Sequence, residues 1–340
     1  MSYDESWVIR QLTAPFIQAG LYDADFEYQN DAARLPFDDS QVLLVSQDML
    51  VEGVDFASPY FSPQDIAYKA LSVNLSDMAA MGATPIGFVQ AIAAARDTPK
   101  SFWQAYAAGL LECAQTYQVP LLGGDLSSTL GPLVIAITVW GQVPKTGKSI
   151  GLTRRQTQVG DFLYVSRPLG DAAAGLDLMR SLKMQMRDCD IDNYERLIQA
   201  QKRPVPELKL GRLLLAQGDC HSAMDLSDGL ASDLSRLLAK GQGACIDAAS
   251  IPLSDALLQY THHHHPHALD FALRGGEDFA LLWAMSPMHE LKLKNIFMPY
   301  GFSMYKIGYV VNTEGIKIIT LNGRQQDLQN GFDHFDISAK

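Results

Sequence analysis

The sequence predicts an α/β or α+β protein built from two packed units, and three observations support this prediction. Segments with helical periodicity alternate with short strand-like apolar runs, a pattern that favours neither a helical bundle nor a β-sandwich. The length of 340 residues is long for one hydrophobic core and comfortable for two. The composition, 47% apolar and 19% charged, is that of an ordinary globular protein rather than a disordered chain.

The first half begins with a segment of helical period at 5–19 and a buried strand at 41–49 that ends beside Asp48. A helix is expected over 62–83, with Ser62 as its N-cap, Pro63 in its first turn and Gly82 at its end. Strands at 86–95 and 131–143 flank a helix at 102–118. The polar, basic stretch at 144–161 is the candidate linker, so we expect domains at 1–145 and 146–340.

The second half repeats the alternation. It is expected to contain a strand at 162–166, helices at 171–180 and 207–217, the motif DLSD before another helix, and a strand at 279–285. In DLSD, Asp225 and Asp228 enclose a serine just before an apolar, helix-periodic run.

Charge and cysteine usage limit the possible partners and compartments. The formal net charge of −11 argues against nucleic acid and against an anionic membrane as partners, because both require a basic face. The four cysteines show no C-x-x-C spacing, and the N-terminus lacks a basic segment followed by an apolar one. We therefore expect a cytoplasmic protein.

Acidic residues recur beside small residues at five places in the chain. These are Asp48, Asp77, Asp125, the pair Asp225 and Asp228, and the pair Glu277 and Asp278. A single D-x-x-D is most often a helix cap or a turn. Five such sites favour another explanation, because small residues allow close approach of an anion and carboxylates suit Mg²⁺ that shares its ligands with phosphates. Magnesium–nucleotide chemistry is the simplest common cause.

Five motifs in order resemble one known family. NLSDMAAMGATP, LLGGD, PLGDAAAGL, AMDLSDGLASDL and LRGGEDFALL are similar to those of the bacterial thiamine-monophosphate kinases of the PurM-like ATP-binding superfamily. The similarity runs from about Asp31 to the terminal GFDHF. It implies a PurM-like two-domain fold, with a mixed α/β N-terminal domain that holds ATP and several Mg²⁺ in a groove and an α+β C-terminal domain. It also implies a homodimer and direct transfer of the γ-phosphoryl group of ATP to thiamine monophosphate, giving thiamine diphosphate.

The resemblance also implies roles for individual residues. The expected metal ligands are Ser46, Asp48, Asp77, Asp125, Asp225 and Asp228, with Asn30 and Gln47 at two further positions of the metal-binding motifs. Asp125, Arg154 and Ser227 match nucleotide contacts, and Arg154 and Asp228 are the expected catalytic residues. Glu277 matches a substrate-binding acid that faces the aminopyrimidine, and Phe332 matches an aromatic that packs on the substrate.

Three departures from the family pattern keep an alternative open. Asn30 stands where the family has a metal-binding carboxylate, and Gln47 replaces the middle residue of the S/T-T-D motif. Asp55, which is expected to bind substrate, stands where the family has a histidine beside the substrate. An acid there repels a phosphate unless a metal or proton intervenes. In the alternative, the chain binds nucleotide or a thiamine-like ligand without efficient transfer, or phosphorylates another small molecule.

Overall fold

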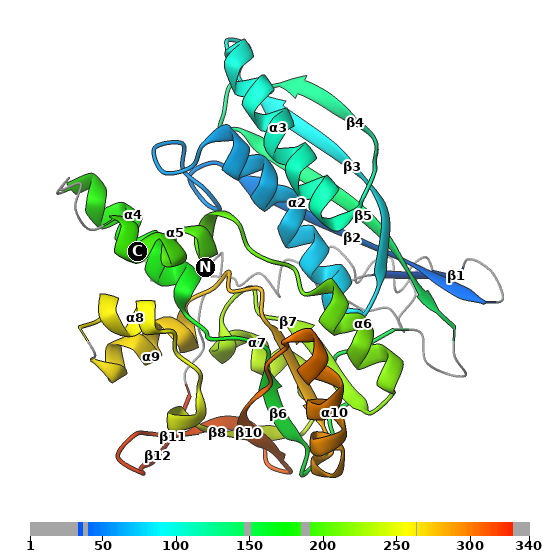
Figure 1. Ribbon diagram of the computed structural model, residues 1–340, viewed down its shortest axis with the longest axis vertical. Helices are drawn as coiled ribbons and strands as arrows, with labels where there is room; N and C mark the ends of the chain where they lie inside the picture. Colours follow the sequence, from blue (N-terminus) through cyan, green and yellow to red (C-terminus); the bar gives the residue numbers. More distant parts are fainter. Residues whose placement is uncertain (1–32, 37–39, 146–150, 185–190, 263, 329–340) are drawn as a thin grey trace, which may run out of the picture.

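Two β-sheets organise the molecule, as the sequence predicts for an α/β protein (Figure 1). The computed structural model describes residues 33–36, 40–145, 151–184, 191–262 and 264–328. The first sheet ends at Pro144 and the second begins at Phe162, so each half of the chain supplies one sheet. The domain boundary between 145 and 146 stays a prediction, and the helix expected at 5–19 lies outside the described residues.

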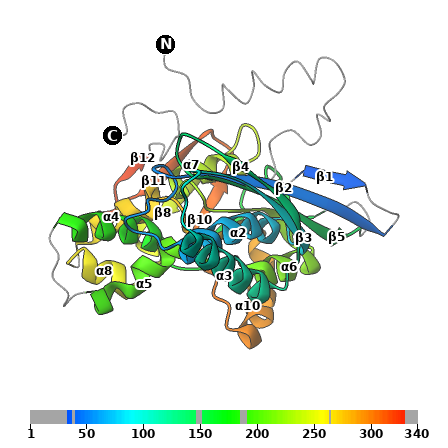
Figure 2. The same ribbon diagram turned by 90° about the horizontal axis from the view of Figure 1, so that it is seen from above.

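The first sheet has five strands in the order β1-β2-β5-β3-β4. They are β1 (Ala33–Pro36), β2 (Gln41–Val51), β3 (Thr84–Ala94), β4 (Leu121–Ser128) and β5 (Val134–Pro144). All neighbours are antiparallel except β3 and β4, whose parallel pairing is connected by helix α3 (Lys100–Tyr117), as a crossover connection requires. Figure 2 shows α2 (Pro63–Ala80) and α3 beneath one face of this sheet. The side chains of β2 alternate accordingly, with Val42, Leu44 and Leu50 buried against the helices.

Helix α2 is the central element of the N-terminal half. It begins as predicted, because Ser62 and Asp65 form a reciprocal capping box and Pro63 occupies the first turn. Nearly every side chain of the helix is buried, so it packs against neighbours on all sides. Its C-cap is Met81, and Gly82 follows with a φ of 69°, a conformation in which glycine carries no Cβ penalty.

The second sheet has seven strands in the order β12-β11-β8-β10-β6-β9-β7. They are β6 (Phe162–Val165), β7 (Cys220–Asp225), β8 (Gly243–Asp247), β9 (Leu281–Met285), β10 (Tyr305–Val311), β11 (Gly315–Ile319) and β12 (Gln325–Asp327). The helices of this half are α4 (Asp171–Met184), α5 (Ile191–Lys202), α6 (Leu208–Gln217), α7 (Leu230–Leu237), α8 (Asp255–Tyr260), α9 (His265–Arg274) and α10 (Glu290–Phe297), with short 3₁₀ turns at Ala248–Ser250, Pro287–His289 and Met298–Tyr300. Figure 1 shows α4, α5, α8 and α9 grouped on one side and α6 and α10 on the other.

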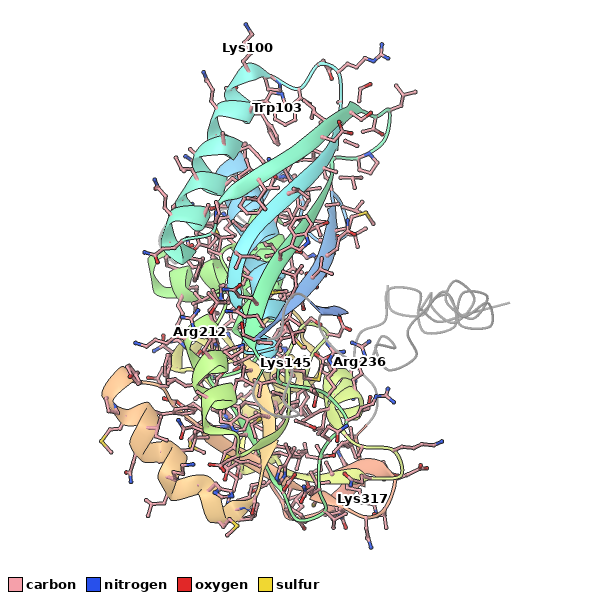
Figure 3. All side chains as sticks on the ribbon, turned by 90° about the vertical axis from the view of Figure 1, so that its right-hand side faces the viewer. Lys100, Trp103, Lys145, Arg212, Arg236 and Lys317 are labelled. Atoms are coloured by element: carbon pink, nitrogen blue, oxygen red, sulfur yellow. The ribbon has the colours of Figure 1, made fainter. Side chains whose placement is uncertain are left out.

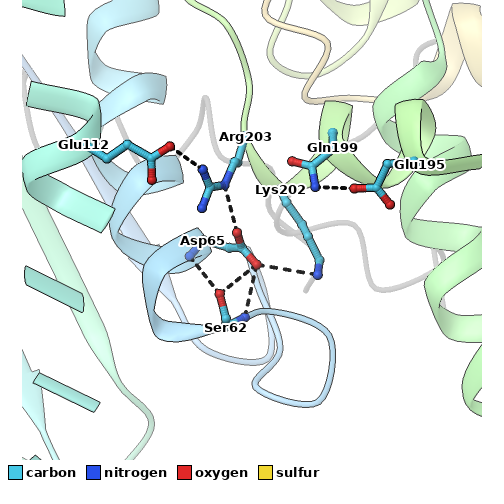
Figure 4. A network of polar contacts seen from close by, with 7 residues as sticks. All are labelled: Ser62, Asp65, Glu112, Glu195, Gln199, Lys202 and Arg203. Atoms are coloured by element: carbon cyan, nitrogen blue, oxygen red, sulfur yellow. Dashed lines mark hydrogen bonds and ion pairs between the residues drawn. The ribbon is translucent and has the colours of Figure 1, made fainter. Parts of the chain in front are cut away.

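The two halves meet through helix α2, which packs against α6. The backbones come so close that a Cβ added at Gly211 of α6 would lie 1.9 Å from the carbonyl oxygen of Ala79. A second link joins α2 to the end of α5, where Asp65 accepts from Arg203 Nε at 2.9 Å and lies 3.5 Å from Lys202 Nζ (Figure 4). Arg203 also reaches Glu112 of α3 at 2.7 Å. The junction therefore combines glycine-mediated helix packing with charged contacts.

No helix in the described parts of the chain combines the length and apolarity needed to cross a bilayer.

Candidate active site

One face of α2 carries polar residues that point at the C-terminal half. Asp65, Lys69, Ser72 and Ser76 follow one another at spacings of four, three and four, so they form a single stripe along the helix. We call these four residues the α2 stripe. Three of them reach across the junction: Asp65 to Arg203, Lys69 to Glu277 and Ser76 to Asp225. The stripe is the surface on which the site is assembled.

Acidic residues from β2, α2 and β7 gather at the C-terminal end of the stripe. The Ser46 hydroxyl donates to the Asp77 carboxylate, and the backbone N–H of Asp48 donates to the Asn74 side chain at 2.9 Å. Ser76 donates to Asp225, whose side chain is almost completely buried where β7 ends. The structure therefore brings together four of the predicted ligands, Ser46, Asp48, Asp77 and Asp225, from both halves of the chain.

The DLSD loop after β7 is paired with the GGED loop before β9. Backbone N–H groups of Glu277 and Phe279 donate to the carbonyls of Ser227 and Leu226 at 2.7 and 2.8 Å. A Cβ at Gly276 would lie 2.5 Å from the Ser227 carbonyl oxygen, so this close approach requires glycine. Glu277 adopts a φ of 68°, a left-handed conformation that costs a non-glycine residue roughly 1–2 kcal/mol. The paired loops therefore hold Glu277 and Ser227 in fixed relation.

Asp228 lies in a cluster of alternating charges at the start of α7. Its carboxylate accepts from Arg236, and its backbone N–H donates to Asp233 at 2.9 Å. Arg236 also contacts Asp233 at 3.0 Å. Burial and the Asp228 charge raise the pKa of Asp233 to about 7, against the opposing effect of Arg236 and of Arg154. The Arg154 charge therefore acts on this cluster. Figure 3 shows Arg236 at the level where the two halves meet.

Glu277 lies at the other end of the loop pair, in contact with Lys69. Lys69 Nζ is 2.6 Å from Glu277 Oε1 and donates to the Asp55 carbonyl at 3.0 Å. Gln201, at the end of α5, donates to the second carboxylate oxygen of Glu277. The carboxylate of Asp55 accepts from the Val51 N–H at 2.7 Å and so holds the turn after β2. Asp55 and Glu277, both predicted to bind substrate, are thus brought together through Lys69.

Asp278, next to Glu277, binds backbone N–H groups at the start of α4 rather than a side chain of the α2 stripe. Its carboxylate accepts from the N–H of Gly170 at 2.7 Å and of Ala172 at 3.3 Å, where α4 begins. Burial raises the pKa of this carboxyl to about 7, although the two hydrogen bonds act in the opposite direction. Asp278 therefore anchors the PLGDAAAG segment to the GGED loop.

Two predicted ligands lie apart from the acids at the junction. The strand register aligns Asp125 with Met49 across the sheet, on the face away from the helices, whereas Asp48 faces the helices. Gln47 lies on the same outer face as Asp125 and is exposed. Three strand spacings of about 4.8 Å separate β4 from β2, or roughly 14 Å. Asn30 and Phe332 lie outside the described residues.

Within the described ranges, no three side chains of His, Cys, Asp and Glu are grouped closely enough to hold a metal ion. The donors at the junction are nevertheless carboxylates and hydroxyls, which are the oxygen ligands that Mg²⁺ prefers when it also binds phosphates. The donor chemistry of Ser46, Asp48, Asp77 and Asp225 therefore fits magnesium.

Several residues of the site have no counterpart among the sequence predictions: Lys69, Asn74, Ser76, Gln201, Asp233 and Arg236. Lys69 had a detectable signal, because it is a lone cation within a helix of apolar and small residues. Gln201 and Arg236 lie in ordinary polar helical surroundings, and only the tertiary structure brings them to the acids.

Comparisons with known proteins agree with this architecture. Residues 29–143 match the family described as AIR synthase related protein, N-terminal domain. The thiamine-monophosphate kinase of Escherichia coli is 36% identical over 94% of this chain and 94% of its own. That of Haemophilus influenzae is 37% identical over 91% of each chain. The solved structure of AaThiL complexed with AMPPCP and TMP superimposes with a TM-score of 0.81 at 26% identity, covering 98% of this chain and 97% of the other.

Proposed function

Because the chain belongs to the thiamine-monophosphate kinase family, we propose that it transfers the γ-phosphoryl group of ATP to the phosphate of thiamine monophosphate. The observation that carries the proposal is the meeting of acids from both halves along α2, with Ser76 bonded to Asp225 and Asp77 bonded to Ser46. The complex of the related AaThiL with AMPPCP and TMP supports a site for a nucleotide and a second ligand.

Magnesium is part of this proposal. Asp48, Asp77 and Asp225, with Ser46, would hold it. When bound, Mg²⁺ neutralises and aligns two phosphate groups that otherwise repel each other. Asp225 has little freedom to move, since it ends a buried strand and accepts from Ser76. The family position of Asp125 as a further ligand stays a proposal, as do those of Asn30 and Gln47.

The chain's own cations would stabilise the transferring group. The acceptor phosphate is already anionic at neutral pH, so the reaction requires charge compensation and alignment more than proton transfer. Arg154 lies near Asp233 and Arg236, and a guanidinium can bind phosphate oxygens in a bidentate manner. Arg236 holds the Asp228 carboxylate in place at the start of α7, where it would face the bound phosphates and their metal. Ser227, fixed by the loop pair, would contact the nucleotide.

The acceptor would bind at the Glu277 end of the site. A carboxylate accepts hydrogen bonds only, so Glu277 suits the amino group of an aminopyrimidine. The Asp55 carboxylate accepts a hydrogen bond from the Val51 N–H, so one of its oxygens is directed at the backbone rather than at the acceptor. This contact supports a working kinase over a relative in which Asp55 repels the substrate.

The deciding experiment incubates purified protein with ATP, Mg²⁺ and thiamine monophosphate, and follows ADP and thiamine diphosphate together. Equal amounts of both products, lost in Asp228→Asn, are expected. ADP without thiamine diphosphate would favour a different acceptor, and binding of ATP without either product would favour the diverged binding protein. Asp55→His tests the departure at this position, since a large gain in activity would point to lost function and a large loss would point to an acid recruited for this enzyme.

We also propose that the chain is a homodimer, as the family resemblance implies. Strand β4 is exposed along its whole length, with Leu121, Leu122 and Leu126 each more than half exposed. A cavity of about 1120 Å³ between α3 and the edge of the sheet is lined mainly by apolar side chains. An exposed apolar edge strand of this kind promotes aggregation unless another chain or element covers it. Light scattering after gel filtration should give about twice the chain mass of 37.4 kDa, and Leu126→Asp should shift it to the monomer.

A further inference from the structure

We infer that Lys69 is a positioning residue for the acceptor, acting through Glu277; this inference rests on the function proposed above. Lys69 is 1% exposed, and its ammonium group lies 2.6 Å from Glu277 Oε1. The same group donates to the Asp55 carbonyl and lies 5.2 Å from the centre of the Phe61 ring. A single buried cation thus joins the turn after β2 to the GGED loop.

Of Lys69, Gln201 and Glu277, only Glu277 is substantially exposed to solvent. Its side chain is 29% exposed, whereas its two partners, Lys69 and Gln201, are each 1% exposed. Each partner takes one lone pair from a different carboxylate oxygen, and a carboxylate has about four such positions. The remaining lone pairs stay available on the exposed side, where they can accept N–H groups of a ligand.

The orientation of Gln201 is dictated by Glu277. A carboxylate cannot donate, so the amide nitrogen of Gln201 must face it, and the amide oxygen must point away. That oxygen is buried and has no hydrogen-bond partner in the described parts of the chain. A buried amide oxygen without a hydrogen-bond partner destabilises the fold. We therefore explain Gln201 by its hydrogen bond to Glu277 rather than by a contribution to stability.

The same reasoning applies to Lys69. A buried ion pair contributes little to stability compared with apolar residues of similar size, so its presence is better explained by what it holds in place. Glu277 also keeps a left-handed backbone, which persists only where surrounding contacts determine it. Lys69 and Gln201 together fix both oxygens of this strained residue toward an amino-substituted heterocycle.

The experiment compares steady-state kinetics of the wild type, Lys69→Met, Lys69→Arg, Glu277→Gln and the double variant Lys69→Met with Glu277→Gln. Lys69→Met should raise the KM for thiamine monophosphate at least tenfold and leave the KM for ATP within twofold. Lys69→Arg should recover part of the loss, because it keeps the charge. If Lys69 acts through Glu277, the double variant should be no worse than Glu277→Gln alone.

The double variant also protects the test from misfolding, because it removes both charges of the pair rather than leaving one buried alone. An unchanged KM for thiamine monophosphate in Lys69→Met would overturn the inference while the kinase proposal stands. Equal rises in both KM values, or additive losses in the double variant, would also overturn it. A wild type without thiamine diphosphate production would refute the proposed function itself, and with it the role of Lys69.

Discussion

Replacing Gly211 with alanine tests how tightly the two halves are joined. In a helix interior, glycine to alanine normally stabilises by about 1 kcal/mol. Here the new Cβ would lie 1.9 Å from the Ala79 carbonyl oxygen, so α6 would have to move about 1.5 Å away from α2 to reach ordinary contact. Both partners are backbone atoms of regular helices, so neither can yield by rotating a side chain. Overpacking of this kind costs about 1–3 kcal/mol or more, which outweighs the gain in helix propensity.

We therefore expect Gly211→Ala to lower the free energy of unfolding, measured by urea denaturation followed by circular dichroism. The matched control is Ala216→Gly, an exposed position of the same helix, which should lose up to about 1 kcal/mol from propensity alone. Because α2 also carries Ser76 and Asp77, the alanine variant should lose kinase activity more than stability alone explains. A more stable Gly211→Ala protein would refute the reasoning that the helix backbones are in direct contact.

Three further predictions concern single carboxylates. Burial alone would raise the pKa of Asp65, but hydrogen bonds from Arg203 and Ser62 and the Lys202 charge lower it. The ionised carboxylate therefore stabilises the fold above pH 4, and this stabilisation is lost in acid. Asp65→Asn should lower the free energy of unfolding in urea at pH 7 by about 2–3 kcal/mol, and an unchanged free energy would contradict the network. The raised pKa of Asp278 means that its contribution to stability is complete below pH 4 and falls by up to about 1.4 kcal/mol per pH unit until about pH 7. Urea unfolding of wild type and Asp278→Asn from pH 4 to 9 should show this slope below about pH 7 in the wild type only, and equal slopes would contradict the raised pKa. Ser76→Ala removes the donor to Asp225 and should raise the Mg²⁺ concentration for half-maximal activity severalfold, whereas an unchanged Mg²⁺ dependence would exclude a role for this contact.

The local signals in the sequence predicted much of the fold. Ser62 and Pro63 identified the start of α2, because a cap and a first-turn proline act within one turn of helix. The apolar run at 41–49 became β2, and the DLSD motif does lie between a strand and a helix. Such features depend on neighbours within a few residues, so the sequence alone suffices to predict them.

Features that depend on strand order or on distant partners were not predictable. Asp125 and Asp48 each belong to a strand, but β5 and β3 lie between those strands, and the register places the two acids on opposite faces. Lys69 meets Glu277 more than 200 positions later, where no local pattern could indicate the contact. The motifs therefore predicted which residues could bind ligands, and the strand order and register determine which of those acids lie close together.

The α2 stripe also sets a length. Asp77, next to Ser76 of the stripe, follows Lys69 by eight positions, so at 1.5 Å per residue the two are about 12 Å apart along the helix axis. On the proposed function, the helix acts as a ruler between the ring of the acceptor and the phosphates at the magnesium end. Inserting one residue between them would turn the two ends by about 100° relative to each other, so the stripe would no longer face one partner. A side-chain substitution on this helix changes one contact, whereas an insertion or deletion changes the relation between its two ends.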